Sequence, residues 1–149
     1  MQHQEVEAFR ISADAYCDFI DSCRSFDEEE SFSKLLKILS QLYTKALDLP
    51  EVKSEEEFPI DVDFLLPEIE VKKHNVYREI FNPYQDEIPV NGCLDDDILG
   101  IYSDIKKGLI LYEQGHDIEA VWEWKFGLET HWGEHATSAI RALHSIQSL

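Results

Sequence analysis

Near its C-terminal end the chain carries the segment ETHWGEH (129–135), whose residue types could bind a metal ion. His131 and His135 are four residues apart, and Glu134 directly precedes the second histidine. The spacing H-x-x-E-H allows one helix to offer two imidazoles and a carboxylate to zinc. Proteases of this type take a third ligand from a glutamate well downstream, but only fourteen residues follow His135. A third ligand would have to come from another helix, as in four-helix metal bundles, and the candidates are His74, Asp97 and Asp104.

The same two histidines also have a structural interpretation, which depends on the helix that carries them. At about 100° per residue, His135 lies in the middle of an apolar stripe and His131 lies on its border. The apolar members of this stripe are Val121, Trp124, Leu128, Trp132, Ala139, Ala142, Leu143 and Ile146. A histidine in such a stripe is usually a core residue that is hydrogen-bonded to a neighbour, because an unpaired buried nitrogen costs about 1–3 kcal/mol.

We favour the structural interpretation and predict no cofactor and no metal. His135 is expected to be buried under Trp124, Leu128 and Trp132, with a hydrogen bond to Asp104 or Tyr102 of the preceding helix. Metal binding remains the alternative. Its candidate ligands are His131, Glu134, His135, Asp97 and Asp104.

The acidic run Asp95–Asp97, with Asp104 further along, could likewise hold a divalent cation. Aspartates at the start of a helix, however, meet free backbone amides and the positive end of the helix dipole. We therefore interpret the run as a helix start.

Other short motifs exclude several classes of enzyme. Cys17, Cys23 and Cys93 form no C-x-x-C pair, which predicts free thiols in a reducing cytoplasm and no catalytic cysteine. The chain has no G-x-G-x-x-G, no Walker loop and no G-x-S-x-G, so nucleotide-cofactor enzymes and serine hydrolases are unsupported.

The elements that position these residues are predicted from apolar spacing. Steps of three and four predict a helix over 6–23, a second over 31–47 and a shorter one between Phe64 and Phe81. Acidic residues and Pro59 make 51–62 a connection, and two prolines with Asn-Gly make 82–92 a loop. No segment alternates strictly between apolar and polar residues, so a sheet is not expected.

The C-terminal third predicts a helix from Asp95 to Gly115 and a last helix from Asp117 almost to Leu149. Gly108 and Trp124 fall at spacings typical of a close helical hairpin. The predicted fold is all-α: a single-domain helical bundle over residues 1–149 with five or six helices. The last two form a long antiparallel hairpin.

The net charge of −18 comes from 31 acidic and 13 basic side chains. Such a surface repels nucleic acid and anionic membranes, and it could attract a basic protein partner or only maintain solubility. With no apolar run of about 20 residues and no signal-like N-terminus, we expect a cytoplasmic protein.

Several segments resemble a bacterial family described as domain of unknown function 5063. The most specific are LDDDILGIYSDIKKGLILYEQG (94–115) and AVWEWKFGLETHWGEHATSAIRALHSI (120–146), with FRISADAYCDFI, LSQLYTKALDLPEV and VYREIFNP before them. The resemblance covers nearly the whole chain. It implies a small cytosolic, all-helical protein and brings no activity and no site residues.

Three functions follow as hypotheses. The first is a non-enzymatic protein-interaction module with an acidic surface. The second is a metal-dependent enzyme built on His131, Glu134 and His135. The third is a small-ligand or sensor module with a pocket lined by Trp122, Trp124 and Trp132, whose rings could equally fill the core.

Overall fold

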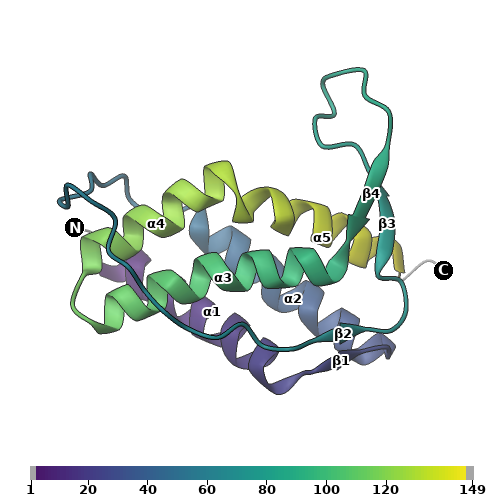
Figure 1. Ribbon diagram of the computed structural model, residues 1–149, viewed down its shortest axis with the longest axis horizontal. Coiled ribbons are helices and arrows are strands. Elements are labelled where there is room, and N and C mark those ends of the chain that lie inside the picture. Colours follow the sequence, from purple (N-terminus) through teal and green to yellow (C-terminus); the bar gives the residue numbers. More distant parts are fainter. Residues whose placement is uncertain (1–2, 147–149) are drawn as a thin grey trace.

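The computed structural model of the protein describes residues 3–146, and in this part of the chain it contains five helices and two small sheets. The helices are α1 (His3–Ser22), α2 (Glu29–Ala46), α3 (Leu94–Glu113), α4 (Asp117–Thr130) and α5 (Trp132–Ile146). Helix α3 packs against α1, α4 and α5, and α2 packs against α1 and α5. The result is a bundle in which α4 and α5 follow one another along one side (Figure 1).

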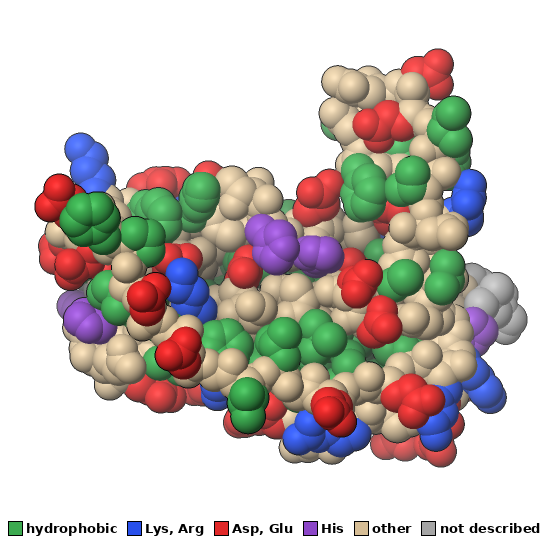
Figure 2. Space-filling model, viewed as in Figure 1, with side chains coloured by type: hydrophobic (Ala, Val, Ile, Leu, Met, Phe, Trp, Pro, Cys, Tyr) green, Lys and Arg blue, Asp and Glu red, His purple; other side chains and the backbone are tan. Residues whose placement is uncertain are grey.

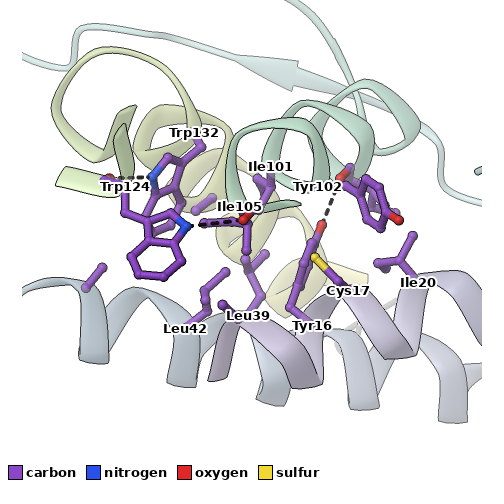
Figure 3. Packing of buried hydrophobic residues seen from close by; sticks show 14 of the residues in the cluster. Tyr16, Cys17, Ile20, Leu39, Leu42, Ile101, Tyr102, Ile105, Trp124 and Trp132 are labelled. Carbon is purple, nitrogen blue, oxygen red and sulfur yellow. Dashed lines mark hydrogen bonds between the residues drawn. The ribbon is translucent and has the colours of Figure 1, made fainter. Parts of the chain in front are cut away.

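The apolar spacing correctly predicts the inward faces of the first two helices. Helix α1 buries Val6, Phe9, Ala13, Tyr16, Cys17 and Ile20, and α2 buries Phe32, Leu35, Leu39, Leu42 and Ala46. These side chains meet the two core tryptophans and the buried face of α3 (Figure 3). Across that core, the Tyr16 hydroxyl donates to the carbonyl of Ile98 at 2.8 Å, which ties α1 to α3.

The C-terminal hairpin differs from the prediction, because its second arm is two helices rather than one. Helix α4 ends at Thr130, His131 leaves helical geometry at φ −148° and ψ −78°, and α5 begins at Trp132. The break lets the Trp132 indole fold back and donate to the carbonyl of Trp124 at 2.8 Å (Figure 3). Gly133 is needed there, since a Cβ at this position would lie 1.9 Å from the carbonyl oxygen of Leu128. The predicted end of this helix near Leu149 lies outside the described residues.

The predictions of a helix between Phe64 and Phe81 and of no sheet are wrong. Strand β1 (Ser25–Phe26) pairs in parallel with β2 (Glu70–Val71). Strands β3 (Val76–Glu79) and β4 (Val90–Cys93) pair antiparallel, with Val76 opposite Cys93 and Glu79 opposite Val90. Strands of two to four residues are too short to show a period of two, which explains why the pattern missed them. The fold is therefore mostly helical but not purely all-α.

The two connections largely match their predictions. Residues 51–62 have no helix or strand, and the start of this segment is held by Glu119, whose carboxylate accepts hydrogen bonds from the Ser54 hydroxyl and the Glu55 amide. Residues 82–89 form a loop as predicted. The last three residues of the predicted loop, 90–92, belong instead to β4 (Val90–Cys93). The loop and its two strands project from the bundle as an arm (Figure 1). All three cysteines are free thiols, and no helix in the described residues is long and apolar enough to cross a membrane.

Candidate functional site

A cleft of about 260 Å³ lies between the projecting hairpin, the first turn of α3 and the junction of α4 with α5. Most of the residues that line it carry polar or charged side chains; the lining consists of Tyr77, Phe81, Asn91, Gly92, Cys93, Asp96, Asp97, Thr130, His131, Glu134, His135 and Ser138. In the space-filling view, histidine side chains are exposed near the middle of this face, in the angle between hairpin and bundle (Figure 2). Four of the five candidate metal ligands line the cleft.

A buried carboxylate organises one side of the cleft. Asp97 is only 5% exposed, and its two oxygens have different partners. One oxygen is 2.8 Å from Nδ1 of His135, and the other accepts a short hydrogen bond from the hydroxyl of Tyr77. The three side chains come from α3, α5 and β3, so the network joins the hairpin to the bundle.

A second histidine–carboxylate pair stands beside the first. Nδ1 of His131 is 2.8 Å from a carboxylate oxygen of Asp104, which lies two turns further along α3 than Asp97. The rings of His131 and His135 are 4.9 Å apart between centroids and nearly perpendicular. One helical turn joins them, since the amide of His135 lies 3.4 Å from the carbonyl oxygen of His131.

Two glycines make room for the rings of Tyr77 and His135. A Cβ at Gly92 would lie 2.6 Å from the ring of Tyr77, so only glycine lets that tyrosine cross β4 towards Asp97. A Cβ at Gly100 would lie 3.0 Å from Nε2 of His135. Glycine at this position therefore lets the ring of His135 pack closely against α3.

The electrostatics follow from burial and from the carboxylates. The hydrogen bond to Asp97 raises the pKa of His135 above its usual value of 6.5, more than burial lowers it. Burial, reinforced by Asp97, raises the pKa of the Tyr77 hydroxyl, which therefore stays protonated as a donor. Burial also raises the pKa of Glu79 at the end of β3. The carboxylates around the cleft make it attract cations and repel anions.

The hairpin that walls the cleft is also an exposed apolar surface, which we call the hairpin surface. Every residue from 80 to 91 is exposed. Half of the twelve exposed large apolar residues in the described part of the chain lie on this arm: Val76, Ile80, Phe81, Tyr84, Ile88 and Val90. Green side chains accordingly mark the arm in Figure 2. The apolar spacing does not reveal the hairpin surface, because it predicts a helix where β3 lies.

The histidine predictions are partly correct. His135 does bond to a carboxylate of the preceding helix, but the partner is Asp97, and Asp104 pairs with His131 instead. His135 is not buried: its side chain is 30% exposed, because the break at His131 turns α5 away from the expected stripe.

Other predicted residues lie apart from the cleft or change role. His74 lines a different hollow, with Val76 and Arg141. Trp124 and Trp132 are fully buried and pack against Phe9. Trp122 instead stacks on Phe126, so the three indoles do not line one open pocket.

The aspartate run only partly serves as the expected helix start. Asp95 accepts a hydrogen bond from the amide of Asp96, and Asn75 accepts one from the amide of Asp95. Asp97 faces the cleft instead. Within residues 3–146, one group of three potential ligands has its donor atoms within 4.8 Å of one another: Cys93, Asp95 and Asp96.

With this geometry in place, comparison with known proteins identifies the family. The family described as domain of unknown function (DUF5063) matches residues 1–148. The chain belongs to this family. Among solved structures, it is similar to protein BF1032 from Bacteroides fragilis, with a TM-score of 0.76 and 20% identity, over 95% of this chain and 91% of that one. At this identity the likeness shows a shared fold. A search of curated proteins finds no match.

Proposed function

We propose that the protein is a protein-interaction module that docks a basic partner on the hairpin surface. The observation that supports this most directly is the concentration of exposed apolar side chains on the arm. Tyr84 is 96% exposed and Ile88 is 86% exposed, although both are large enough to stabilise a core if buried. Several large apolar side chains that stay exposed in one region of the surface are typical of a docking site.

The strands of the arm offer a second means of attachment. Their sheet has two strands, so β3 and β4 each have one edge without a strand partner in the described structure. An extended segment of another protein can add to such an edge through backbone hydrogen bonds, while pockets for alternate side chains supply specificity. The exposed apolar side chains would then contact that segment.

Charge favours a basic partner over a second copy of the chain. Each copy carries a net charge of −18, so two copies repel one another. The arm itself carries Glu79, Asp86 and Glu87, and its one basic residue, Arg78, is bonded to Asn91 and to the carbonyl of Pro89. A segment with apolar residues flanked by lysine or arginine fits both the apolar and the acidic character of the arm.

A displayed peptide library tests this proposal without a known partner. Peptides selected on the wild-type protein should combine apolar and basic residues, and their binding should weaken as salt is added. The double variant Tyr84→Ser/Ile88→Ser should lose this binding. Phe58→Ser/Leu65→Ser is the matched control, because Phe58 and Leu65 are also large and exposed, at 73% and 93%, but lie outside the arm.

Two results would contradict the proposal. Selected peptides that bind the Tyr84/Ile88 variant as well as the wild type would place docking elsewhere. A concentration-dependent dimer in sedimentation, lost in that variant, would make a second copy the occupant of the arm.

A further inference from the structure

We propose that the cleft binds a divalent transition-metal ion, with Nε2 of His131 and Nε2 of His135 as its protein ligands. This inference does not depend on hairpin docking, because it rests on the histidine–carboxylate pairs. The two rings stand 4.9 Å apart, line the same cleft and come from one junction between helices.

The carboxylates decide which ring nitrogens are available. Asp97 and Asp104, when ionised, can only accept hydrogen bonds, so Nδ1 of each neutral imidazole must carry the proton. The lone pair of each ring is then at Nε2. Histidines that bind metals usually have this arrangement, in which a carboxylate on the second nitrogen fixes the tautomer and makes the ligating nitrogen more basic.

Access to the two rings is supported by the exposure of their side chains. The side chain of His131 is 51% exposed and that of His135 is 30% exposed, so neither ring is enclosed in the core. A Cβ at position 100 of α3 would lie 3.0 Å from Nε2 of His135, so any residue larger than glycine there would crowd this atom.

The ligand types select the class of metal. Imidazole nitrogen suits zinc, copper, nickel and cobalt, whereas magnesium and calcium prefer oxygen ligands. Within the described residues, no third side chain of a ligand type lies close enough to both histidines to form a group of three with them. Water would therefore complete the coordination of the ion. Glu134, which also lines the cleft, adds negative charge that attracts the cation.

Titration of the chelator-treated full chain with zinc or cobalt, followed by calorimetry, tests the proposal. The expected result is one ion per chain, together with the visible spectrum of nitrogen-bound cobalt. His131→Ala should abolish this binding, and His135→Ala should do the same. His144→Ala is the matched control: His144 is an exposed histidine on the same helix, and its loss should leave affinity unchanged. Asp97→Asn, which removes the carboxylate that supports His135, should weaken binding by about 10- to 100-fold.

The variant Gly100→Ala tests whether lost binding in the histidine variants could result from misfolding. It keeps both histidines and replaces glycine by a better helix former, yet it places a methyl group against Nε2 of His135. A folded Gly100→Ala protein with weakened zinc binding supports the proposal.

Three results would overturn it. The first is zinc binding of unchanged affinity in both histidine variants. The second is zinc binding that Cys93→Ser removes while the histidine variants keep it, which would place the ion at Cys93, Asp95 and Asp96. The third is equal affinity for magnesium and zinc, which would indicate general attraction to the acidic surface. The Tyr84/Ile88 variant should bind zinc normally, so this test and the docking test can fail separately.

Discussion

At the scale of single residues, Asp97 connects more of the candidate site than any other side chain in the cleft. It is buried, and it bonds to Tyr77 on the hairpin and to His135 on α5. Burying a charged group destabilises the folded state unless hydrogen bonds compensate for its lost hydration. Removing one of its hydrogen-bond partners therefore destabilises the protein by about 1–3 kcal/mol. Asp97 therefore couples the position of the arm to the orientation of the imidazole.

This coupling predicts a pH dependence for the metal-free protein. The folded-state pKa of His135 is raised by Asp97, with smaller contributions from Asp104 and Asp96. A raised pKa adds stability that is fully present below the unfolded value of 6.5 and is lost as pH rises through the folded value. In NMR titration of chelator-treated protein, the midpoint of the His135 titration should therefore lie above pH 6.5.

The variant Asp97→Asn supplies the control for that titration. Without the carboxylate, the midpoint of the His135 titration should move to lower pH, and the stability lost as pH rises above 6.5 should shrink. An unchanged His135 titration in Asp97→Asn would show that the bond to Asp97 does not set the pKa.

At the scale of elements, the break at His131 shapes the site, because it ends α4 beneath the cleft and starts α5 in a new direction. A continuous helix would place His135 in the stripe of Trp124 and Leu128. The break instead brings His135 to α3 opposite Asp97, while Trp132 returns to the core.

Sequence patterns predicted the helices well and the break poorly, for a physical reason. Helix periodicity depends on many residues, so α1, α2 and α3 were evident from their apolar faces. The break depends on one close approach, between Gly133 and the carbonyl of Leu128, which periodicity does not record. The candidate ligands were evident from residue type, but Tyr77 was not, because its role requires a four-residue strand and Gly92 opposite it.

The break predicts that Gly133→Ala destabilises the protein. The added methyl group would lie 1.9 Å from the Leu128 carbonyl oxygen, so backbone must move. Overpacking of this kind costs typically about 1–3 kcal/mol, although alanine is the better helix former. Urea unfolding measures the loss, with Thr137→Ala on the exposed face of α5 as the control. A Gly133→Ala protein as stable as the wild type would mean that the junction can relax without cost.

At the scale of the whole molecule, the excess of acidic residues acts on both proposals. Negative charge would attract the metal cation proposed for the cleft, and it would oppose pairing of two copies through the arm. It also acts on stability. Ion pairs such as Lys107–Glu123 and Lys125–Glu51 use a few of the 13 basic side chains, and most of the 31 acidic ones remain as mutually repelling charges.

This imbalance predicts that added salt stabilises the fold. Like charges lie closer together in the compact state than in the unfolded chain, so screening them favours folding. Between about 10 mM and about 500 mM sodium chloride the Debye length falls from roughly 30 Å to a few ångströms, and the melting temperature should rise. The triple variant Glu55→Gln/Glu56→Gln/Glu57→Gln removes three exposed negative charges from the connection before β2, so its melting temperature should depend less on salt. A melting temperature that falls as salt is added would instead show that the ion pairs outweigh the repulsion.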